Sequence, residues 1–213
     1  MLEFFQSNPS DVLNRVEKKK FHSKQKIINS LFLHNECDCN CLASHIHLSV
    51  PSTQTCINEL IKDGIVEEKG HGTSSGGRRP VLYGLVGGLF YILCMDVGRF
   101  HIRLSILDSN LQLIDGIEIH EIRFQDNAEY LDKICEFAIQ RMESSGIQRE
   151  LFIGIGLSMP GAIDSLKGIN YSYTFNQNET LTDALGKRFR LPVFVENDTN
   201  VLALSELWYG QAR

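Results

Sequence analysis

The sequence predicts two domains of different class, an α+β domain followed by an α/β domain whose elements run in the order βββαβαβα. Two observations support this division. Apolar residues recur at helical spacing in three segments before residue 63, and two strand-like segments then flank a Gly- and Ser-rich loop. Beyond residue 88, three strand segments come first and helices then alternate with strands. We therefore expect a tail over residues 1–20, a first domain over 21–86 and a second domain over 87–213.

The composition is that of an ordinary globular protein. The chain has 213 residues, 43% of them hydrophobic and 22% charged, which suggests one to two domains with sizeable cores. No apolar run has the length of a membrane span, and the N-terminus lacks the basic and apolar regions of a signal peptide. We expect a cytoplasmic protein with no membrane partner.

The charge is distributed unevenly along the chain. The net charge of −5 does not by itself favour nucleic-acid binding. Residues 1–86, however, hold ten Lys or Arg and nine Asp or Glu, whereas residues 87–213 hold eleven and seventeen. This difference places any nucleic-acid contact in the first domain, where basic residues cluster near residues 18–26 and 78–79.

The first domain is predicted to begin with two helices. An apolar stripe at helical spacing predicts a helix from Ser23 to about Asn35. A second, shorter helix is expected from Cys41 to His47. Residues 1–20 are polar and show no clear periodicity, so we interpret them as a tail.

The third predicted helix, over about residues 49–63, has the pattern of a recognition helix. Ser49 stands at an N-cap position and Pro51 falls in the first turn, where a missing N–H is tolerated. Apolar residues at steps of three and four predict a buried face, and the opposite face is polar. The polar face consists of Ser52, Gln54, Thr55, Asn58 and Lys62. Amide and hydroxyl side chains bond base edges, so we predict that this face enters the major groove of DNA.

A β-wing is predicted after the third helix. Two strands, near residues 65–69 and 81–83, flank a polar loop that ends in Arg78 and Arg79. The loop glycines would also suit a flexible linker, but apolar strands on both sides favour a wing. Such arginines contact phosphates or enter a minor groove. Three helices and a wing make a winged helix-turn-helix, so we expect a double-stranded DNA operator as partner and a homodimer or higher homo-oligomer.

Six cysteines are present, three of them in the run Cys37-x-Cys39-x-Cys41 with histidines nearby. This spacing differs from the paired knuckles of zinc modules. We interpret the cysteines as small residues at a turn and in a core, reduced in a cytosolic protein. No metal site is therefore predicted.

The second domain is predicted to open with three strands. A continuous apolar run suggests a central strand, and the next segment alternates between apolar and polar residues. The turn Asp96-Val97-Gly98-Arg99 joins these two strands. The expected strands span about residues 89–95, 100–107, 113–120, 151–157 and 192–195, and the expected helices about 131–142, 180–190 and 199–209. This order, with an Asp-x-Gly turn after the first strand, is that of the first lobe of an actin-like (ribonuclease H-like) ATPase domain.

Motifs in both domains carry a resemblance that is more specific than the order of elements. They are Ser74–Pro80 in the wing, Gly154–Gly156 with Pro160–Asp164, and Leu191–Asn200, which contains Glu-Asn-Asp and leads to Glu206 and Tyr209-Gly210. In this order and spacing they resemble the ROK family of bacterial repressors and sugar kinases. The winged domain is similar to the regulator branch, since the kinases lack it. The resemblance implies a transcriptional regulator of carbohydrate metabolism, most often a repressor, that senses a sugar or sugar phosphate. The alternative is an ATP-dependent hexose or hexosamine kinase with an appended DNA-binding domain.

The resemblance also implies roles for individual residues. In the family's kinases the Asp of Glu-Asn-Asp takes the proton from the sugar hydroxyl, and the neighbouring Asn binds sugar hydroxyls. These roles would fall on Asp198 and Asn197, which from the residues alone can equally cap the following helix. We expect both to bind sugar here without catalysis.

The phosphate loop departs from the kinase pattern Asp-x-Gly-Gly-Thr. Asp96 and Gly98 are kept, but Arg99 and Phe100 replace the second Gly and the Thr, and their bulk would obstruct a phosphate. The family's second lobe, with its adenosine pocket and zinc motif, has no counterpart before Arg213. We therefore expect no kinase activity, no catalytic residue and no cofactor.

Overall fold

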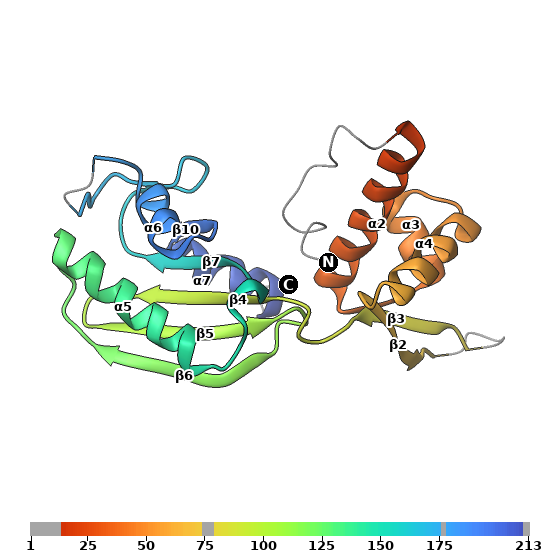
Figure 1. Ribbon diagram of the computed structural model, residues 1–213, viewed down its shortest axis with the longest axis horizontal. Coiled ribbons are helices and arrows are strands. Elements are labelled where there is room, and N and C mark those ends of the chain that lie inside the picture. Colours follow the sequence, from red (N-terminus) through yellow and green to blue (C-terminus); the bar gives the residue numbers. More distant parts are fainter. Residues whose placement is uncertain (1–13, 74–78, 176–177, 211–213) are drawn as a thin grey trace. The chain divides into compact units, whose positions relative to one another are not determined.

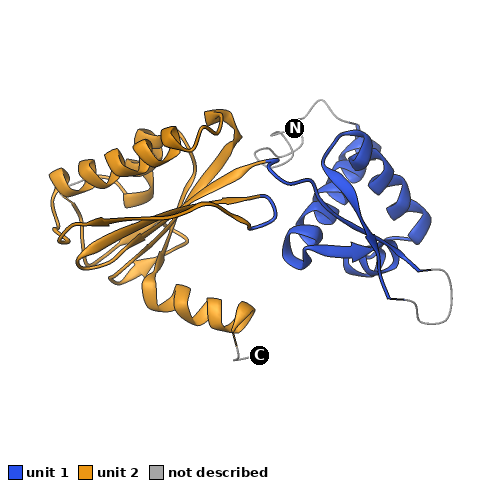
Figure 2. Cartoon of the chain, turned by 90° about the horizontal axis from the view of Figure 1, so that it is seen from below, with its two compact units in different colours: residues 1–89, 109–111 blue, residues 90–108, 112–213 orange. Residues whose placement is uncertain are grey.

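The computed structural model describes residues 14–73, 79–175 and 178–210 (Figure 1). The chain forms two compact units: unit 1 is residues 1–89 with 109–111, and unit 2 is residues 90–108 with 112–213 (Figure 2). Each unit has its own apolar core. Among the described helices, none is both long and apolar enough to cross a membrane.

Unit 1 contains three described helices, α2 (Arg15–His34), α3 (Cys39–Ile46) and α4 (Val50–Lys62). The first begins earlier than predicted because a capping box starts it. The side chain of Asn14 accepts the N–H groups of Val16 and Glu17, while the Glu17 carboxylate accepts the Asn14 N–H at 2.9 Å. The predicted tail over residues 1–20 is therefore too long, since residues 15–20 are helical.

The helix α4 follows the prediction closely. Ser49 is its N-cap and accepts the N–H of Ser52, and a proline lies in the first turn. The buried positions of α4 are Thr53, Cys56, Ile57 and Leu60. The helical spacing predicts an inward face of Thr53, Cys56, Ile57, Leu60 and Ile61. The first four are buried and Ile61 is half-buried, so the helix and its inward face are confirmed.

A three-stranded antiparallel sheet completes unit 1, with strands β1 (Glu36–Asp38), β3 (Val81–Leu85) and β2 (Val66–His71) in that order. The hairpin of β2 and β3 confirms the two strands expected to flank the wing loop. The strand β1 was not predicted, because three residues are too few to show alternation. Of the wing loop, residues 74–78 lie outside the described residues.

Unit 2 is built on a five-stranded mixed sheet. Its order is β10 (Val193–Asn197), β7 (Phe152–Met159), β4 (Tyr91–Val97), β5 (His101–Asp108) and β6 (Leu113–Glu121). The strands β10, β7 and β4 are parallel, and β5 and β6 continue the sheet antiparallel. The helices are α5 (Ala128–Ser144), α6 (Leu181–Phe189) and α7 (Asp198–Tyr209), with a 3₁₀ turn at Arg149–Leu151. The predicted order βββαβαβα is confirmed. Between β7 and α6, where no strand was predicted, the structure adds the short strands β8 (Ile163–Asp164) and β9 (Ile169–Asn170).

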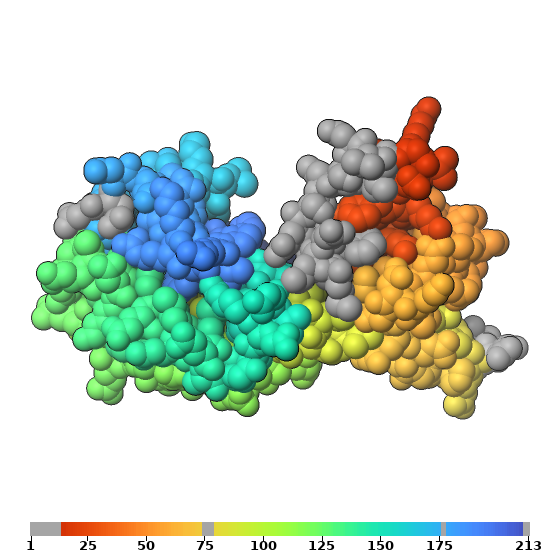
Figure 3. Space-filling model, in the orientation of Figure 1, coloured from red at the N-terminus to blue at the C-terminus, as the bar shows by residue number. Residues whose placement is uncertain are grey.

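The helices of unit 2 lie on both faces of the sheet. Apolar residues of α5 and α6 bury one face with the inward side chains of β4, β5 and β7, and these helices hide much of that face in the space-filling view (Figure 3). The helix α7 lies on the opposite side of the sheet (Figure 2), and none of its residues is buried. The less covered face is the one that holds the cavity of unit 2.

Candidate functional site

The polar face of α4 is open to solvent over most of its length. Ser52, Thr55, Asn58 and Lys62 are exposed. The Thr55 hydroxyl donates to the Pro51 carbonyl at 3.0 Å, which leaves its oxygen lone pairs directed away from the helix. The structure therefore brings four of the predicted base-edge and phosphate contacts together on one accessible surface.

Gln54, the fifth predicted residue on this face, is half-buried and bonded within the unit. Its amide nitrogen donates to Asn58 Oδ1 at 2.9 Å and to the Tyr83 hydroxyl at 3.2 Å. The second bond joins α4 to β3, the strand that follows the wing. Arg79 is exposed at the end of that wing, and Arg78 lies outside the described residues.

Ion pairs join α4 to α2. Lys20 Nζ lies 2.5 Å from a Glu59 oxygen, and Lys24 Nζ lies 3.2 Å from Glu59 and 2.9 Å from Asp63. The hydrogen bond from Lys20 lowers the pKa of Glu59. Part of the basic cluster that the sequence placed in this unit therefore neutralises acidic groups of α4 itself.

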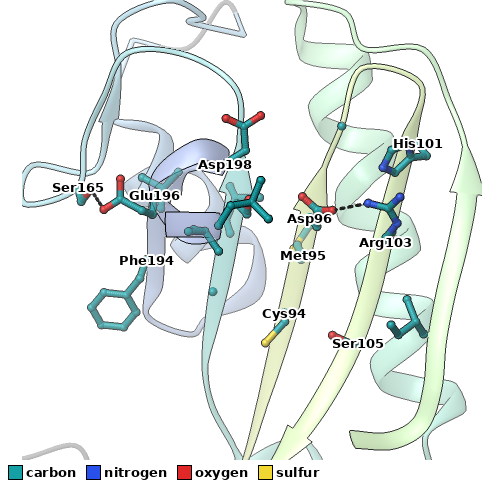
Figure 4. A pocket seen from close by; sticks show the side chains of 18 residues that line it. Cys94, Met95, Asp96, His101, Arg103, Ser105, Ser165, Phe194, Glu196 and Asp198 are labelled. Carbon is teal, nitrogen blue, oxygen red and sulfur yellow. Dashed lines mark hydrogen bonds and ion pairs between the residues drawn. The ribbon is translucent and has the colours of Figure 1, made fainter. Parts of the chain in front are cut away.

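A cavity of about 810 Å³ lies in unit 2, on the sheet face that carries α7 (Figure 4). Strands β4, β5, β7 and β10 form its floor, and the first turns of α7 form a wall. The polar or charged residues that line it include Asp96, His101, Arg103, Ser105, Ser158, Ser165, Glu196 and Asp198. Its volume is within the range of small-molecule sites.

The parallel strands place three polar residues side by side at the floor of this cavity. Asp96 of β4 is the register partner of Ser158 of β7, which is in turn the partner of Glu196 of β10. Because the strands are parallel, their carboxyl ends meet at one edge of the sheet, where ligands of α/β domains commonly bind. The row Asp96–Ser158–Glu196 defines that edge.

Glu196 is the most extensively bonded of these residues. Its carboxylate accepts from the Ser165 hydroxyl at 2.6 Å, from the Asn197 N–H at 2.8 Å and from Asn200 Nδ2 at 3.0 Å. The bond from Ser165, followed by those from Asn200 and Asn197, lowers the pKa of Glu196. Sequence reasoning quoted Glu196 only as part of a motif, and nothing local in the sequence points to Ser165, which lies 31 residues earlier.

The two residues of the predicted sugar site have different surroundings. Asn197 is the N-cap of α7, and its side-chain oxygen accepts the N–H of Thr199 at 2.9 Å and of Asn200 at 3.2 Å. Its amide nitrogen donates to the Gly161 carbonyl at 2.9 Å. Asp198 stands in the first turn and lines the cavity. The capping interpretation therefore holds for Asn197, while Asp198 faces the space a ligand would occupy.

The altered phosphate loop lies between β4 and β5. Asp96 forms an ion pair with Arg103 at 2.9 Å, and a side chain at position 98 would come within 2.8 Å of the His101 ring. Arg99 and Phe100 are exposed at the tip of the turn. In this arrangement the carboxylate already has a cationic partner and the glycine backbone is covered by an imidazole.

Asn170 organises the loop that supports the cavity, and sequence reasoning missed it. Only 4% of its surface is exposed. Its amide donates to the Pro160 carbonyl at 3.1 Å, and its oxygen accepts the N–H groups of Ser172 and Tyr173 at 2.9 and 3.2 Å. A single Asn in a polar loop gives no periodic signal, so only the three-dimensional contacts identify it.

Comparison with known proteins gives one family for unit 2. The family model described as ROK matches residues 92–213. The xylose repressor of Caldicellulosiruptor bescii is 30% identical over 172 residues, which are 78% of this chain and 42% of that protein. A glucokinase of Halalkalibacterium halodurans is 31% identical over 119 residues, 54% of this chain and 36% of that protein. The chain thus spans somewhat less than half the length of the curated relatives it matches.

The extent of each match separates the regulators from the kinase. An alignment of 172 residues is longer than the segment 92–213, so the repressor match extends into unit 1, whereas the glucokinase match of 119 residues is no longer than that segment. The crystal structure of a ROK family transcriptional regulator, a homologue of the E. coli MLC protein, has the same fold. It gives a TM-score of 0.65 at 20% identity and covers 92% of this chain and 50% of that one.

Proposed function

This chain belongs to the ROK family, and we propose that it is a sugar-responsive transcriptional regulator, acting as a repressor. The observation that carries the proposal is the exposed polar face of α4 on a unit of three helices and a hairpin. That unit has the element order of a winged helix-turn-helix. The similarity to a xylose repressor, which extends into this unit, supports the same function.

In the proposed complex, α4 lies in the major groove of an operator. Thr55 and Asn58 contact base edges, Lys62 contacts a phosphate, and Arg78 and Arg79 of the wing contact the neighbouring backbone or minor groove. Gln54 has two proposed roles: it contacts a base edge, and its bond to Tyr83 joins α4 to β3, the strand that follows the wing. Two copies of the chain would bind the two halves of a palindromic site.

The cavity of unit 2 is the proposed effector site. Asp198, Ser158 and the side chain of Glu196 supply acceptors and a donor for sugar hydroxyls, and Phe194 offers an exposed aromatic face to the apolar side of a sugar ring. Because several of the similar regulators are xylose repressors, xylose is the first sugar to test. A sugar or sugar phosphate bound here would alter operator affinity through a coupling free energy.

A sugar kinase is the alternative from another class, favoured by the match to a glucokinase. The surroundings of the altered loop weigh against it. Asp96 is engaged by Arg103, the His101 ring covers Gly98, and Arg99 and Phe100 occupy the turn where backbone N–H groups would hold phosphate. A coupled ADP-release assay with xylose, glucose and N-acetylhexosamines distinguishes the two functions, and we expect no turnover above the sugar-free rate.

The test of the regulator function is selection of DNA by the full chain. A random duplex library is passed through rounds of binding, and the affinity for the enriched sequence is compared by fluorescence anisotropy with that for a scrambled duplex. We expect an enriched palindrome bound at least about 10³-fold more tightly than the scramble. Thr55→Ala and Asn58→Ala should reduce this ratio, whereas Gln140→Ala on the exposed face of α5 should not. Failure to enrich any sequence would contradict the proposal.

Effector binding is tested separately, by calorimetry with the same sugars in the absence of DNA. Heat that saturates with one sugar, and that is lost in Asp198→Asn, supports the cavity as a sensor. If no sugar gives heat while DNA selection succeeds, unit 2 serves only for assembly.

A further inference from the structure

Three side chains of the kinds that bind zinc meet where β1 leads into α3. The Sγ atoms of Cys37 and Cys41 are 3.3 Å apart, and Cys41 Sγ lies 3.7 Å from His45 Nε2. All three ligand atoms lie within 4.8 Å of one another. In a tetrahedral zinc site with ordinary Zn–S and Zn–N bonds, neighbouring ligand atoms are about 3.5–3.8 Å apart. The three atoms therefore already have nearly the spacing that one ion requires.

The local fold explains why these residues converge. Cys41 and His45 are four residues apart on α3, so they lie on the same face of the helix one turn apart. Cys37 lies in β1, opposite Tyr83 of β3. The turn between strand and helix is fixed by the N-cap Asp38, whose carboxylate accepts the Cys41 N–H at 2.8 Å. The position of each donor is thus set by a strand pairing, a cap or a helical turn.

A second contact orients the imidazole. His45 Nδ1 lies 2.8 Å from the hydroxyl of Ser30, a buried residue of α2. This bond directs Nε2 toward the two sulfur atoms, as the outer hydrogen bond of a metal-binding histidine usually does. The ring of His34 lies beside that of His45, with centroids 4.6 Å apart. A thiol pair without a metal would not require this orientation of His45.

We propose that Cys37, Cys41 and His45 bind a Zn²⁺ ion, with a water molecule as the fourth ligand. Two thiolates and an imidazole form a donor set that favours zinc over the other divalent metals common in cells. The ion would join β1 to α3 and, through Ser30, to α2, so it would stabilise unit 1 behind the exposed face of α4. The relevant spacing is Cys37-x₃-Cys41-x₃-His45, and not the Cys37-x-Cys39-x-Cys41 run from which the sequence analysis predicted no site.

Cys39 provides the matched control, because it belongs to the same helix but faces elsewhere. Its thiol donates to the Val50 carbonyl at 3.7 Å, and it is not a member of the cluster. A substitution there tests the effect of losing a cysteine from α3 without removing a proposed ligand.

The experiment measures zinc on the full chain, kept reduced with a phosphine and stripped with a chelator before titration. Bound zinc is counted by mass spectrometry of the metal and its affinity by competition with a chromophoric chelator; Co²⁺ is used as a spectroscopic substitute. We expect one ion per chain, a Co²⁺–thiolate charge-transfer band, and a melting temperature of unit 1 that rises with zinc. Cys39→Ser should retain all three properties, and Cys41→Ser should lose them.

Two further variants keep the test decisive if Cys41→Ser does not fold. His45→Ala changes an exposed residue, and it should lose the ion while circular dichroism shows the helices intact. Ser30→Ala should keep the stoichiometry but weaken zinc binding about 10-fold, as outer hydrogen bonds to metal ligands do. The proposal is overturned if the reduced chain binds no zinc. It is equally overturned if Cys39→Ser and Cys41→Ser bind alike, or if thiol counting shows that Cys37 and Cys41 form a disulfide.

Discussion

The polar motif residues of the two units differ in what their side chains do within the fold. On α4 of unit 1, Thr55 and Asn58 stand on an exposed face while the opposite face forms the core. In unit 2, Asn197 and Glu196 are bonded on several sides by the cap of α7 and by Ser165. The first group makes only local bonds within α4 and stays exposed to a partner. The second group joins α7 to segments distant in the sequence.

This difference determines how each unit should respond to substitution. Substitution of Thr55 or Asn58 removes at most bonds within α4, so DNA binding should fall while the free energy of unfolding changes little. Changes around the cavity of unit 2 also remove internal bonds, so stability and ligand affinity should fall together. If a sugar binds in this cavity as proposed, it would share Glu196 or Asn197 with α7, and the position of that helix would then respond to the ligand.

The largest effect is expected in unit 2, from Asn170→Ala. The change leaves the Pro160 carbonyl and the N–H groups of Ser172 and Tyr173 without their partner, and should lower the free energy of unfolding by about 3 kcal/mol. Calorimetric unfolding measures it, with the exposed Asn178→Ala as control, expected within about 0.5 kcal/mol of wild type. If the free energy of unfolding falls by less than about 1 kcal/mol, the hydrogen bonds of Asn170 contribute little to the stability of unit 2.

The second-largest effect is expected on DNA affinity, with no change in stability. Replacing Arg78 and Arg79 together by Ala should weaken binding to every duplex by about 10–100-fold and reduce the salt slope by about 2, since two phosphate contacts are lost. Anisotropy titrations over a range of salt concentrations measure both quantities. An unchanged salt slope would show that the wing arginines do not contact phosphates. A lowered melting temperature would show that these substitutions also destabilise the fold, as those around the cavity of unit 2 are expected to do.

Substitutions at two neighbouring positions of unit 2 should separate an effect on stability from an effect on sugar binding. Asn197→Ala removes the cap of α7 and should cost about 1 kcal/mol of stability. Asp198→Asn keeps the shape of the side chain and should change stability by less than about 0.5 kcal/mol, yet it should weaken sugar binding. Chemical unfolding and calorimetry with sugar measure the two properties. Equal losses of stability would show that Asp198 is structural as well.

The smallest effect on stability is expected from the surface ion pairs between α2 and α4. Glu59→Gln weakens its pairs with Lys20 and Lys24 and should cost about 0.5 kcal/mol or less at neutral pH, because the pairs are partly exposed. The pKa of Glu59 is lowered in the folded state, so its contribution is present at neutral pH and is lost as the pH falls through that lowered pKa. Unfolding curves of wild type and variant should therefore converge in acid. A constant difference at every pH would exclude the charge as its cause.

The long elements of both units follow from the sequence, because their periodicity is a property of the residues themselves. The inward face of α4 and the order βββαβαβα were predicted correctly for this reason. The strands β1, β8 and β9 have two or three residues each, and their pairing depends on distant partners that no local pattern reveals. The start of α2 was predicted too late because the capping box at Asn14 precedes the apolar stripe.

The candidate sites were predicted less completely than the fold. The polar residues of α4 follow from helical spacing alone, and the structure places them on one face. Ser165 and Asn170, by contrast, act through partners that the chain brings close only after folding. Asn197 caps α7, which was one of its two expected roles. Its bond to the Gly161 carbonyl, 36 residues away, follows from no local pattern.

If α4 reads DNA as proposed, the internal hydrogen bonds of Gln54 would make its contact with a base an exchange of partners. The Gln54 amide nitrogen already donates to Asn58 Oδ1 and to the Tyr83 hydroxyl, so a base that accepts from it would displace one of these partners. A base that offers no acceptor would leave both internal bonds in place. These internal bonds would in this way reduce the gain from a base contact at Gln54 to the difference between the new hydrogen bond and the one it replaces.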